Sequence, residues 1–87
     1  MSTFRCLLLV QEKKLLDEEI TSLSAPGGLG YLEVLAHHAP LITSLKRGIL
    51  RMRNGETHRS FIVSGGILEV CENTALILAD NVEKKET

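Results

Sequence analysis

Short apolar segments separated by turn-forming residues recur along this chain, and they limit its fold more than any other feature of the sequence. Segments of this length and spacing are typical of an all-β sandwich or barrel, whereas few of them match the period of a helix. The first segment, residues 4–10, alternates so that one face carries Phe4, Cys6, Leu8 and Val10. Because Leu7 and Leu9 fill the other face, we expect an inner strand that is buried on both sides.

A hairpin is predicted over residues 48–63. Leu50 and Met52 alternate with arginines, so the apolar pair should point inward and the basic groups toward water or a partner. Asn54-Gly55 favours the two positive φ angles of a type I′ turn, and the returning strand would occupy residues 57–63.

A second hairpin is predicted after Ser64-Gly65-Gly66 interrupts the apolar pattern. Strands at 67–71 and 74–80 would pair across Glu72-Asn73, because short polar residues of this kind form tight turns. The polar tail at 81–87 would either fray or begin a helical turn.

The segment 11–23 conflicts with this all-β pattern. It contains strong helix formers and places Leu15, Leu16, Ile20 and Leu23 at helical spacing, so taken alone it favours a helix. The competing interpretation is a hairpin with strands near residues 14–16 and 19–25, because tertiary context often outweighs local propensity.

The length and composition allow one small domain, with the sandwich expected over 1–81 and a polar tail over 82–87. Aromatic residues make up only 3% of the chain and its formal charge is -1, which argues against a nucleic-acid-binding surface. No segment approaches the roughly 20 apolar residues of a membrane span, and the first ten residues do not resemble a signal peptide. We therefore expect contact with a membrane only through a partner protein.

Two cysteines, Cys6 and Cys71, lie among apolar neighbours and lack the spacing of a zinc site. We expect both to be reduced thiols in the core of a cytosolic protein.

Three local features hint at chemistry, and each has a simpler explanation. Pro26 to Gly30 is glycine-rich, but no helical segment follows it, so a tight turn is favoured over a phosphate-binding loop. His37 and His38 are adjacent on an extended chain and would point to opposite sides, which disfavours a shared metal ion. Ser64 lacks the surrounding motif of a nucleophilic serine. No catalytic residue, metal ligand or cofactor is predicted.

Basic residues concentrate in the middle of the chain, at Lys46, Arg47, Arg51, Arg53 and Arg59. Without interleaved aromatic residues, they are best explained as solvated strand faces or as salt bridges to an acidic partner. Phosphate contacts to a nucleic acid are the less favoured alternative.

Several motifs fall in one consistent order along the chain. They are Gly27-Gly28-Leu29-Gly30, His38-Ala39-Pro40-Leu41-Ile42-Thr43, Lys46-Arg47-Gly48, the block from Phe61 to Val70 that contains Ser-Gly-Gly-Ile-Leu-Glu-Val, and Leu78-Ala79-Asp80. Together they resemble the epsilon subunits of F-type ATP synthases, from Phe4 to about Asp80. The block ending at Val70 is the most specific part of the resemblance.

The chain departs from that family pattern in three places. The stretch between Gly30 and His38 is about three residues longer than usual, and Ala36 stands where the family generally has proline. Gly28 occupies a turn position that is often acidic, so a charged contact is not carried over. The family's C-terminal helical hairpin is missing after Thr87, as expected of either a naturally short subunit or an isolated domain. Neither inhibition nor ATP binding is therefore assigned.

The resemblance implies a two-layer β-sandwich of about ten short strands that works as a non-catalytic part of the central stalk. It implies contact with the gamma subunit and the membrane c-ring, on the cytoplasmic face of a bacterial inner membrane or an equivalent membrane. The interface residues it implies are Gly27, Gly28, Leu29, Gly30, Tyr31, His38, Leu41, Ile42 and Thr43. We expect His38 and Thr43 to face gamma, Gly27 to Gly30 to face the ring, and some of the larger side chains to be exposed.

The alternative hypothesis is a free-standing β-sandwich that binds a ligand or acts as a small enzyme through His37, His38 and Ser64. A pocket that joins these three residues would favour that hypothesis, whereas an open apolar patch would favour the stalk.

Overall fold

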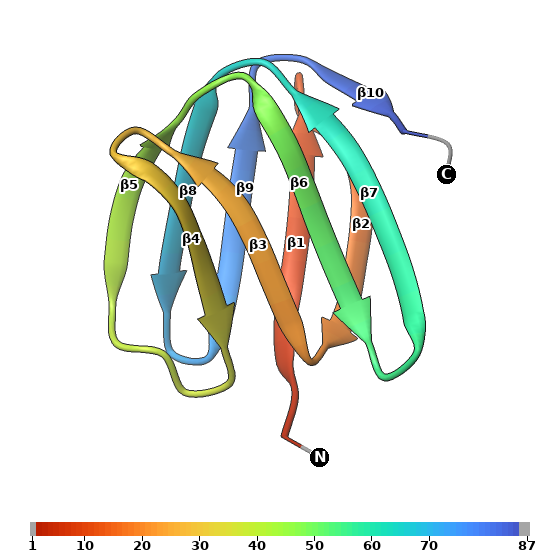
Figure 1. Cartoon of the computed structure of the whole chain (residues 1–87), viewed down its shortest axis with the longest axis vertical. Coiled ribbons are helices and arrows are strands. Elements are labelled where there is room, and N and C mark those ends of the chain that lie inside the picture. The colour runs from red at the N-terminus through yellow and green to blue at the C-terminus, as the bar shows by residue number, and fades with distance from the viewer. Residues whose placement is uncertain (1, 86–87) are drawn as a thin grey trace.

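The computed structural model describes residues 2–85, which form ten β-strands, and this part of the chain contains no helix (Figure 1). The strands are β1 (Phe4–Val10), β2 (Lys13–Ile20), β3 (Ser22–Gly27), β4 (Gly30–Leu35), β5 (Leu41–Leu45), β6 (Gly48–Asn54), β7 (Thr57–Val63), β8 (Gly66–Cys71), β9 (Thr74–Ala79) and β10 (Val82–Lys84).

All ten strands belong to one hydrogen-bonded sheet, in the order β10-β7-β6-β3-β5-β8-β9-β1-β2, with β4 paired to β3. The sheet folds over where β3 meets β5, at the pair Gly27 and Leu45. In Figure 1, strands β4, β3, β6, β7 and β10 consequently form a front layer, and β5, β8, β9, β1 and β2 form a back layer. The predicted all-β, two-layer sandwich of about ten short strands is confirmed.

The core lies between the two layers and is built from alternate residues of their strands. On β1 the inward positions are Phe4, Cys6 and Leu8, and all three are buried. The largest buried side chains from the other strands are Ile20, Leu23, Val34, Leu50, Met52, Val63, Leu68 and Ile77. Because β1 lies between β2 and β9, the prediction of an inner strand at 4–10 is confirmed, but its burial on both sides is not seen within this chain, since Leu7 and Leu9 are only half-buried.

The segment with helical propensity is extended in the structure. β2 pairs antiparallel with β1 along its length, and its turn residues Gln11 and Glu12 have φ angles of 48° and 66°. Pairing satisfies one edge of the inner strand β1, and it buries Leu16 and Ile20 against the core. These tertiary gains outweigh the local preference for a helix.

The two later hairpins form as predicted, but one turn differs. Asn54 ends β6, and the turn residues are Gly55, with a φ of 63°, and Glu56, whose φ is not positive. The prediction of a type I′ turn at Asn54-Gly55 is therefore wrong, because one positive φ at the first turn position fits a type II′ turn. Two positive φ angles occur instead at Glu72 and Asn73, at 48° and 56°.

The predicted tail contains a short strand. Val82–Lys84 pairs with β7 as strand β10, so this part neither frays nor begins a helix. The backbone N–H of Lys85 also donates to the Ser60 carbonyl at 3.1 Å, which extends the attachment. The end of the tail, residues 86–87, lies outside the described residues.

Gly66 offers a test of the packing between β8 and β9. Its φ is +135°, and a Cβ there would overlap the carbonyl oxygen of Leu78 and lie 2.9 Å from the Cα of Ala79. We expect Gly66→Ala to lower the free energy of unfolding by about 2–4 kcal/mol. The control is Gly55→Ala, where φ is +63° and no atom lies within 4 Å, so only the left-handed backbone penalty of about 1 kcal/mol applies. Equal losses in urea unfolding would contradict this explanation.

Candidate subunit interface

Aliphatic side chains predominate on the outer surface of the back layer, which we call the apolar face, and the exposed Glu69 lies among them as the cross-strand partner of Ile42 and Leu76. The strand register places its members side by side: Ile67 pairs with Leu78, and Leu78 with Leu9. Leu76 pairs with Leu7 in the next row. The exposed fractions are 70% for Ile42, 47% for Ile67 and 44% for Leu78. The apolar face comprises Leu7, Leu9, Ile42, Ile67, Leu76 and Leu78.

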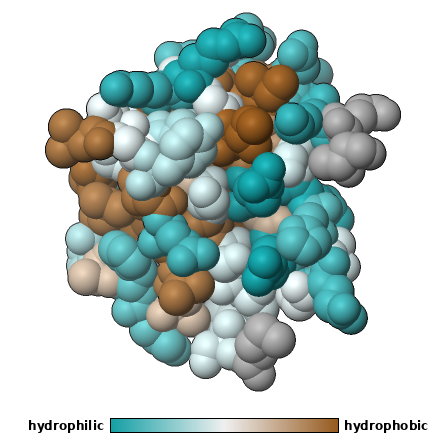
Figure 2. Space-filling view, in the orientation of Figure 1, coloured by the Kyte–Doolittle hydropathy of each residue, from teal (hydrophilic) through white to brown (hydrophobic). Residues whose placement is uncertain are grey.

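The front layer differs, because its outward positions are largely polar. They include Ser22, Ser24, Glu33, Arg51 and Arg53. Figure 2 shows this surface: hydrophobic side chains gather toward β4 and β5 and in a second group over the upper part of β6 and β7, and hydrophilic ones occupy much of the rest. An antiparallel sheet with one solvated face normally carries polar residues there, as the front layer does. The apolar face of the back layer thus has the character of a surface that a partner covers.

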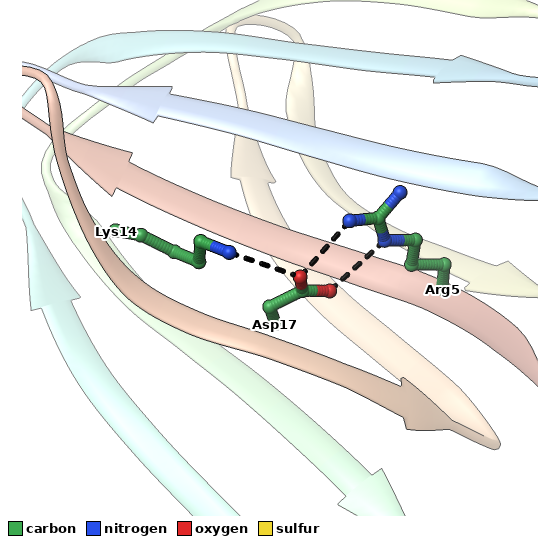
Figure 3. Close-up of polar contacts among 3 residues, drawn as sticks. All are labelled: Arg5, Lys14 and Asp17. Carbon is green, nitrogen blue, oxygen red and sulfur yellow. Dashed lines mark hydrogen bonds and ion pairs between the residues drawn. The ribbon is translucent and has the colours of Figure 1, made fainter.

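A charged cluster borders the apolar face on the β2 side (Figure 3). The Arg5 guanidinium donates two hydrogen bonds to the Asp17 carboxylate, both at 2.9 Å, and the Lys14 ammonium donates a third at 3.3 Å. These contacts, led by the hydrogen bonds from Arg5, lower the pKa of Asp17 to about 2. Asp17 is the β2 partner of Leu7, so the cluster lies directly beside the apolar residues. A polar rim around an apolar centre is typical of protein interfaces.

A second exposed feature is the turn between β3 and β4, which we call the tip (Gly27 to Gly30). Leu29 is fully exposed, at 106%. The Gly28 N–H donates to the Ser44 carbonyl at 2.9 Å, and a Cβ on Gly28 would lie 2.6 Å from the Ser44 hydroxyl oxygen. Strand β4 follows the turn, so the prediction of a tight turn in place of a phosphate-binding loop is confirmed.

The structure separates the predicted interface residues into different regions. Ile42 belongs to the apolar face, and Tyr31 is 61% exposed on β4 beside the tip. Leu41 and Thr43 are half-buried and alternate with Ile42, so they point to the opposite side of β5. The expectation that some of the large side chains would be exposed is confirmed, while a role in an interface stays a prediction.

His38 lies in the loop after β4, at the end of β5 remote from the tip. It is exposed, and its ring nitrogen Nδ1 is 2.7 Å from the Ala39 carbonyl oxygen. The neighbouring His37 adopts a positive φ of 64°, and its N–H donates to the Asn73 side chain at 2.7 Å.

Five members of the apolar face were not singled out from the sequence as interface residues: Leu7, Leu9, Ile67, Leu76 and Leu78. One signal was present. Residues 4–10 and 74–80 are apolar on both faces, which predicts strands covered on both sides.

The residues of the alternative ligand-binding hypothesis are far apart. His37 contacts Asn73, in the turn beyond Cys71, whereas Ser64 precedes Gly66 at the other end of β8. At about 3.3 Å per residue, the length of β8 separates them by roughly 16 Å. Neither of two surface hollows contains any of the three residues; one is lined partly by Leu15, Phe61 and Val82, and the other partly by Ser22 and Leu35. Over residues 2–85 no cluster of metal-binding side chains occurs.

Two of the basic residues in the middle of the chain bond to other side chains of this chain. Arg59 forms an ion pair with Glu18 at 2.7 Å, which links β7 to β2, and Arg47 donates to the Ser64 hydroxyl at 3.4 Å. The Arg59 pair lies within this chain, so the predicted salt bridges to an acidic partner stay a prediction.

The fold and the apolar face together define a β-sandwich interaction domain, and comparison with known proteins gives its family. Residues 3–85 match the family model described as the ATP synthase, Delta/Epsilon chain, beta-sandwich domain. The chain belongs to this family.

Relatives named ATP synthase epsilon chain include those of Dehalococcoides mccartyi and Xanthomonas oryzae. The first is 37% identical over 86 residues, covering 99% of this chain and 61% of the relative. The second is 43% identical over 88 residues, covering 99% of this chain and 62% of the relative. The chain thus spans less than two thirds of the length of these curated relatives.

Two solved assemblies contain a chain with the same fold. One is the mitochondrial ATP synthase of Euglena gracilis with OSCP, F1 and c-ring, at a TM-score of 0.89, 22% identity, and coverage of 94% of this chain and 53% of that chain. The other is the central stalk and c-ring of the Tetrahymena thermophila mitochondrial ATP synthase, at a TM-score of 0.80, 18% identity, and coverage of 92% and 65%. Within the described part of this chain, no helix has the length and apolar character required to cross a membrane.

The two cysteines differ from the prediction that both lie in the core. Cys6 is buried, and burial raises the pKa of its thiol to about 12, whereas Cys71 occupies an outward position on β8 and is exposed. Both are free thiols, as expected, but the core assignment of Cys71 is wrong because the strand alternation turns it outward.

This difference predicts selective labelling. A maleimide should add once to the native chain, at Cys71, and twice after unfolding, with the adducts counted by mass spectrometry. Cys71→Ser should remove the native adduct. Two adducts on the native protein would contradict the burial of Cys6.

The charged cluster predicts a pH dependence of stability. The pKa of Asp17 falls from 3.8 to about 2 on folding, so its contribution is present above pH 3.8 and is lost as the pH falls through 2. We expect wild type to unfold at a higher temperature than Asp17→Asn at neutral pH, and the difference to disappear between about pH 4 and pH 2. High salt should reduce it, since the pair is on the surface. A difference that persists at pH 2 would contradict the assignment, and Glu33→Gln is the control.

Proposed function

We propose that this chain is a non-catalytic rotor subunit of a proton-translocating F-type ATP synthase, which joins the gamma subunit to the c-ring. Its membership of the delta/epsilon family supports this, as do relatives that carry the name epsilon chain. The assemblies that contain the same fold include a central stalk and c-ring.

The apolar face is the observation that carries the proposal. An enzyme needs a concave site with convergent polar groups, whereas this surface is open and made of aliphatic side chains on adjacent strands. A standard protein interface covers about 800 Å² on each partner. Set against the 5419 Å² surface of the whole chain, one such contact would cover a large part of the back layer. We assign this face to the gamma subunit.

The rotor role also explains why two separate contact surfaces are needed. Moving one proton across 100 mV releases about 2.3 kcal/mol, and several protons per turn load the joint between ring and stalk. A part that transmits this load must hold both partners. We assign the tip to the ring and His38 to the neighbourhood of gamma, whereas Thr43, also expected there from the sequence, points away from the apolar face.

The chemistry of the complex belongs to other subunits in this proposal. This chain requires no cofactor, and its membrane contact is made through the complex. The corresponding location is the cytoplasmic face of a bacterial inner membrane or an equivalent energy-coupling membrane.

Ile42 provides the sharpest test. We expect Ile42→Ala to weaken binding to purified gamma by about ten-fold, because it truncates the most exposed of the aliphatic side chains on the face assigned to gamma. Its exposed fraction of 70% means that folding should change little. The control is Leu35→Ala, which truncates a leucine of 53% exposure on the front layer.

Protection of Cys71 gives an independent measurement. Gamma that covers the apolar face should block maleimide labelling of Cys71, which lies on the same outer surface of β8. Two results would remove the support for this function. One is a parent chain that does not bind gamma, and the other is equal gamma binding by Ile42→Ala and Leu35→Ala.

A further inference from the structure

Strand β3 changes partner along its length, and this leaves one backbone donor of β6 unpaired by the ladder. Residues Ser22 to Ser24 pair with β6 as far as Arg51. Two residues later, the Pro26 carbonyl instead accepts the N–H of Lys46 at 2.8 Å. Proline also has no N–H to offer. The β3–β6 ladder therefore stops before it reaches Ile49.

Tyr31 provides the missing acceptor. It lies on β4, opposite Pro26 and on the other side of β3 from β6. The Ile49 N–H donates to its hydroxyl oxygen at 2.8 Å, so the side chain spans β3. A backbone donor left without an acceptor in a sheet is unfavourable, and the hydroxyl prevents this.

The space for this contact depends on Gly48. A Cβ there would lie 2.6 Å from the Tyr31 hydroxyl oxygen and 2.7 Å from the Cβ of Pro26. Tyr31 and Pro26 thus meet above a residue that has no side chain. Three elements, β3, β4 and β6, are joined at this point.

The joint lies directly beside the tip. One arm of the tip is held by the bonds from Gly28 to Ser44 and from Lys46 to Pro26, and the other arm is held by Tyr31. The Leu29 side chain is fully exposed, so the two arms fix the backbone from which it projects. A turn whose backbone is already held in place avoids part of the ordering entropy of association.

We infer that Tyr31 is a positioning residue, which holds the turn that carries Leu29 and so presents that leucine for contact with the ring. The inference rests on the proposed rotor function. In this inference, the hydroxyl group of Tyr31 bonds within the chain itself, and Leu29, two positions earlier in the sequence, makes the contact with the ring.

A double-mutant cycle on the 87-residue chain tests this role, with binding measured to purified gamma and to the detergent-solubilised c-ring. Tyr31→Phe removes one hydrogen bond and keeps the ring, so we expect ring binding to weaken about five-fold. The affinity of Tyr31→Phe for gamma should stay unchanged. A general loss of folding would instead weaken binding to both partners. In a Leu29→Ala background, Tyr31→Phe should have no further effect, because both act through one contact.

Two further measurements secure the result. Amide exchange at Ile49 should accelerate in Tyr31→Phe, which tests the hydrogen bond without any partner. Gly48→Ala, which displaces the Tyr31 hydroxyl by a different route, should weaken ring binding in the same way. Glu33→Gln, on the same face of β4, is the matched control and should bind like the parent chain.

The outcomes distinguish the two proposals. Additive effects of Leu29→Ala and Tyr31→Phe, or normal ring binding by Tyr31→Phe with faster exchange at Ile49, would overturn the positioning role alone. A parent chain that binds neither gamma nor the ring would overturn the rotor function itself.

Discussion

The change of partner by β3 is the constraint on which the rest of the structure depends. One continuous sheet becomes two layers because the first half of β3 pairs with β6 and its end pairs with β5. Pro26 marks the switch, since it cannot donate to either neighbour. Without this fold-over, the inward residues of β1, β8 and β9 would have no opposing layer to pack against. The same switch creates the unpaired Ile49 donor and places the tip at the corner of the sandwich.

The centre of the back layer explains why one of its surfaces remains unsatisfied. β1 and β9 run parallel, and parallel strands are usually covered on both faces. Their inward residues meet the front layer, while Leu7, Leu9, Leu76 and Leu78 face outward. In the proposed rotor, burial of these leucines by a partner would supply the second cover that strands of this kind require.

Much of the fold could be predicted from alternation and turn residues, because both are local signals. The strand at 4–10 and both later hairpins are examples. Residues 11–23 could not be assigned locally, since only pairing with β1 decides between helix and strand. For the candidate interface, Leu29, Tyr31 and Ile42 were proposed through a family resemblance, but the neighbours of Ile42 on the apolar face depend on register between distant strands. The link between Tyr31 and Ile49 spans 18 positions and crosses a strand, so no sequence pattern indicates it.

The two exposed surfaces have different physical properties, which suit different tasks in the proposed rotor. Hydrophobic contact across the apolar face scales with area and has no preferred direction, so it holds a partner but resists sliding weakly. The tip is a single leucine on a turn tied to β5 and β6, and a side chain seated in a recess opposes sideways displacement through steric contact. Torque acts sideways at the surface of a rotating ring. The broad face therefore contributes affinity for the shaft, and the rigid tip contributes the resistance to slipping that transmission of torque requires.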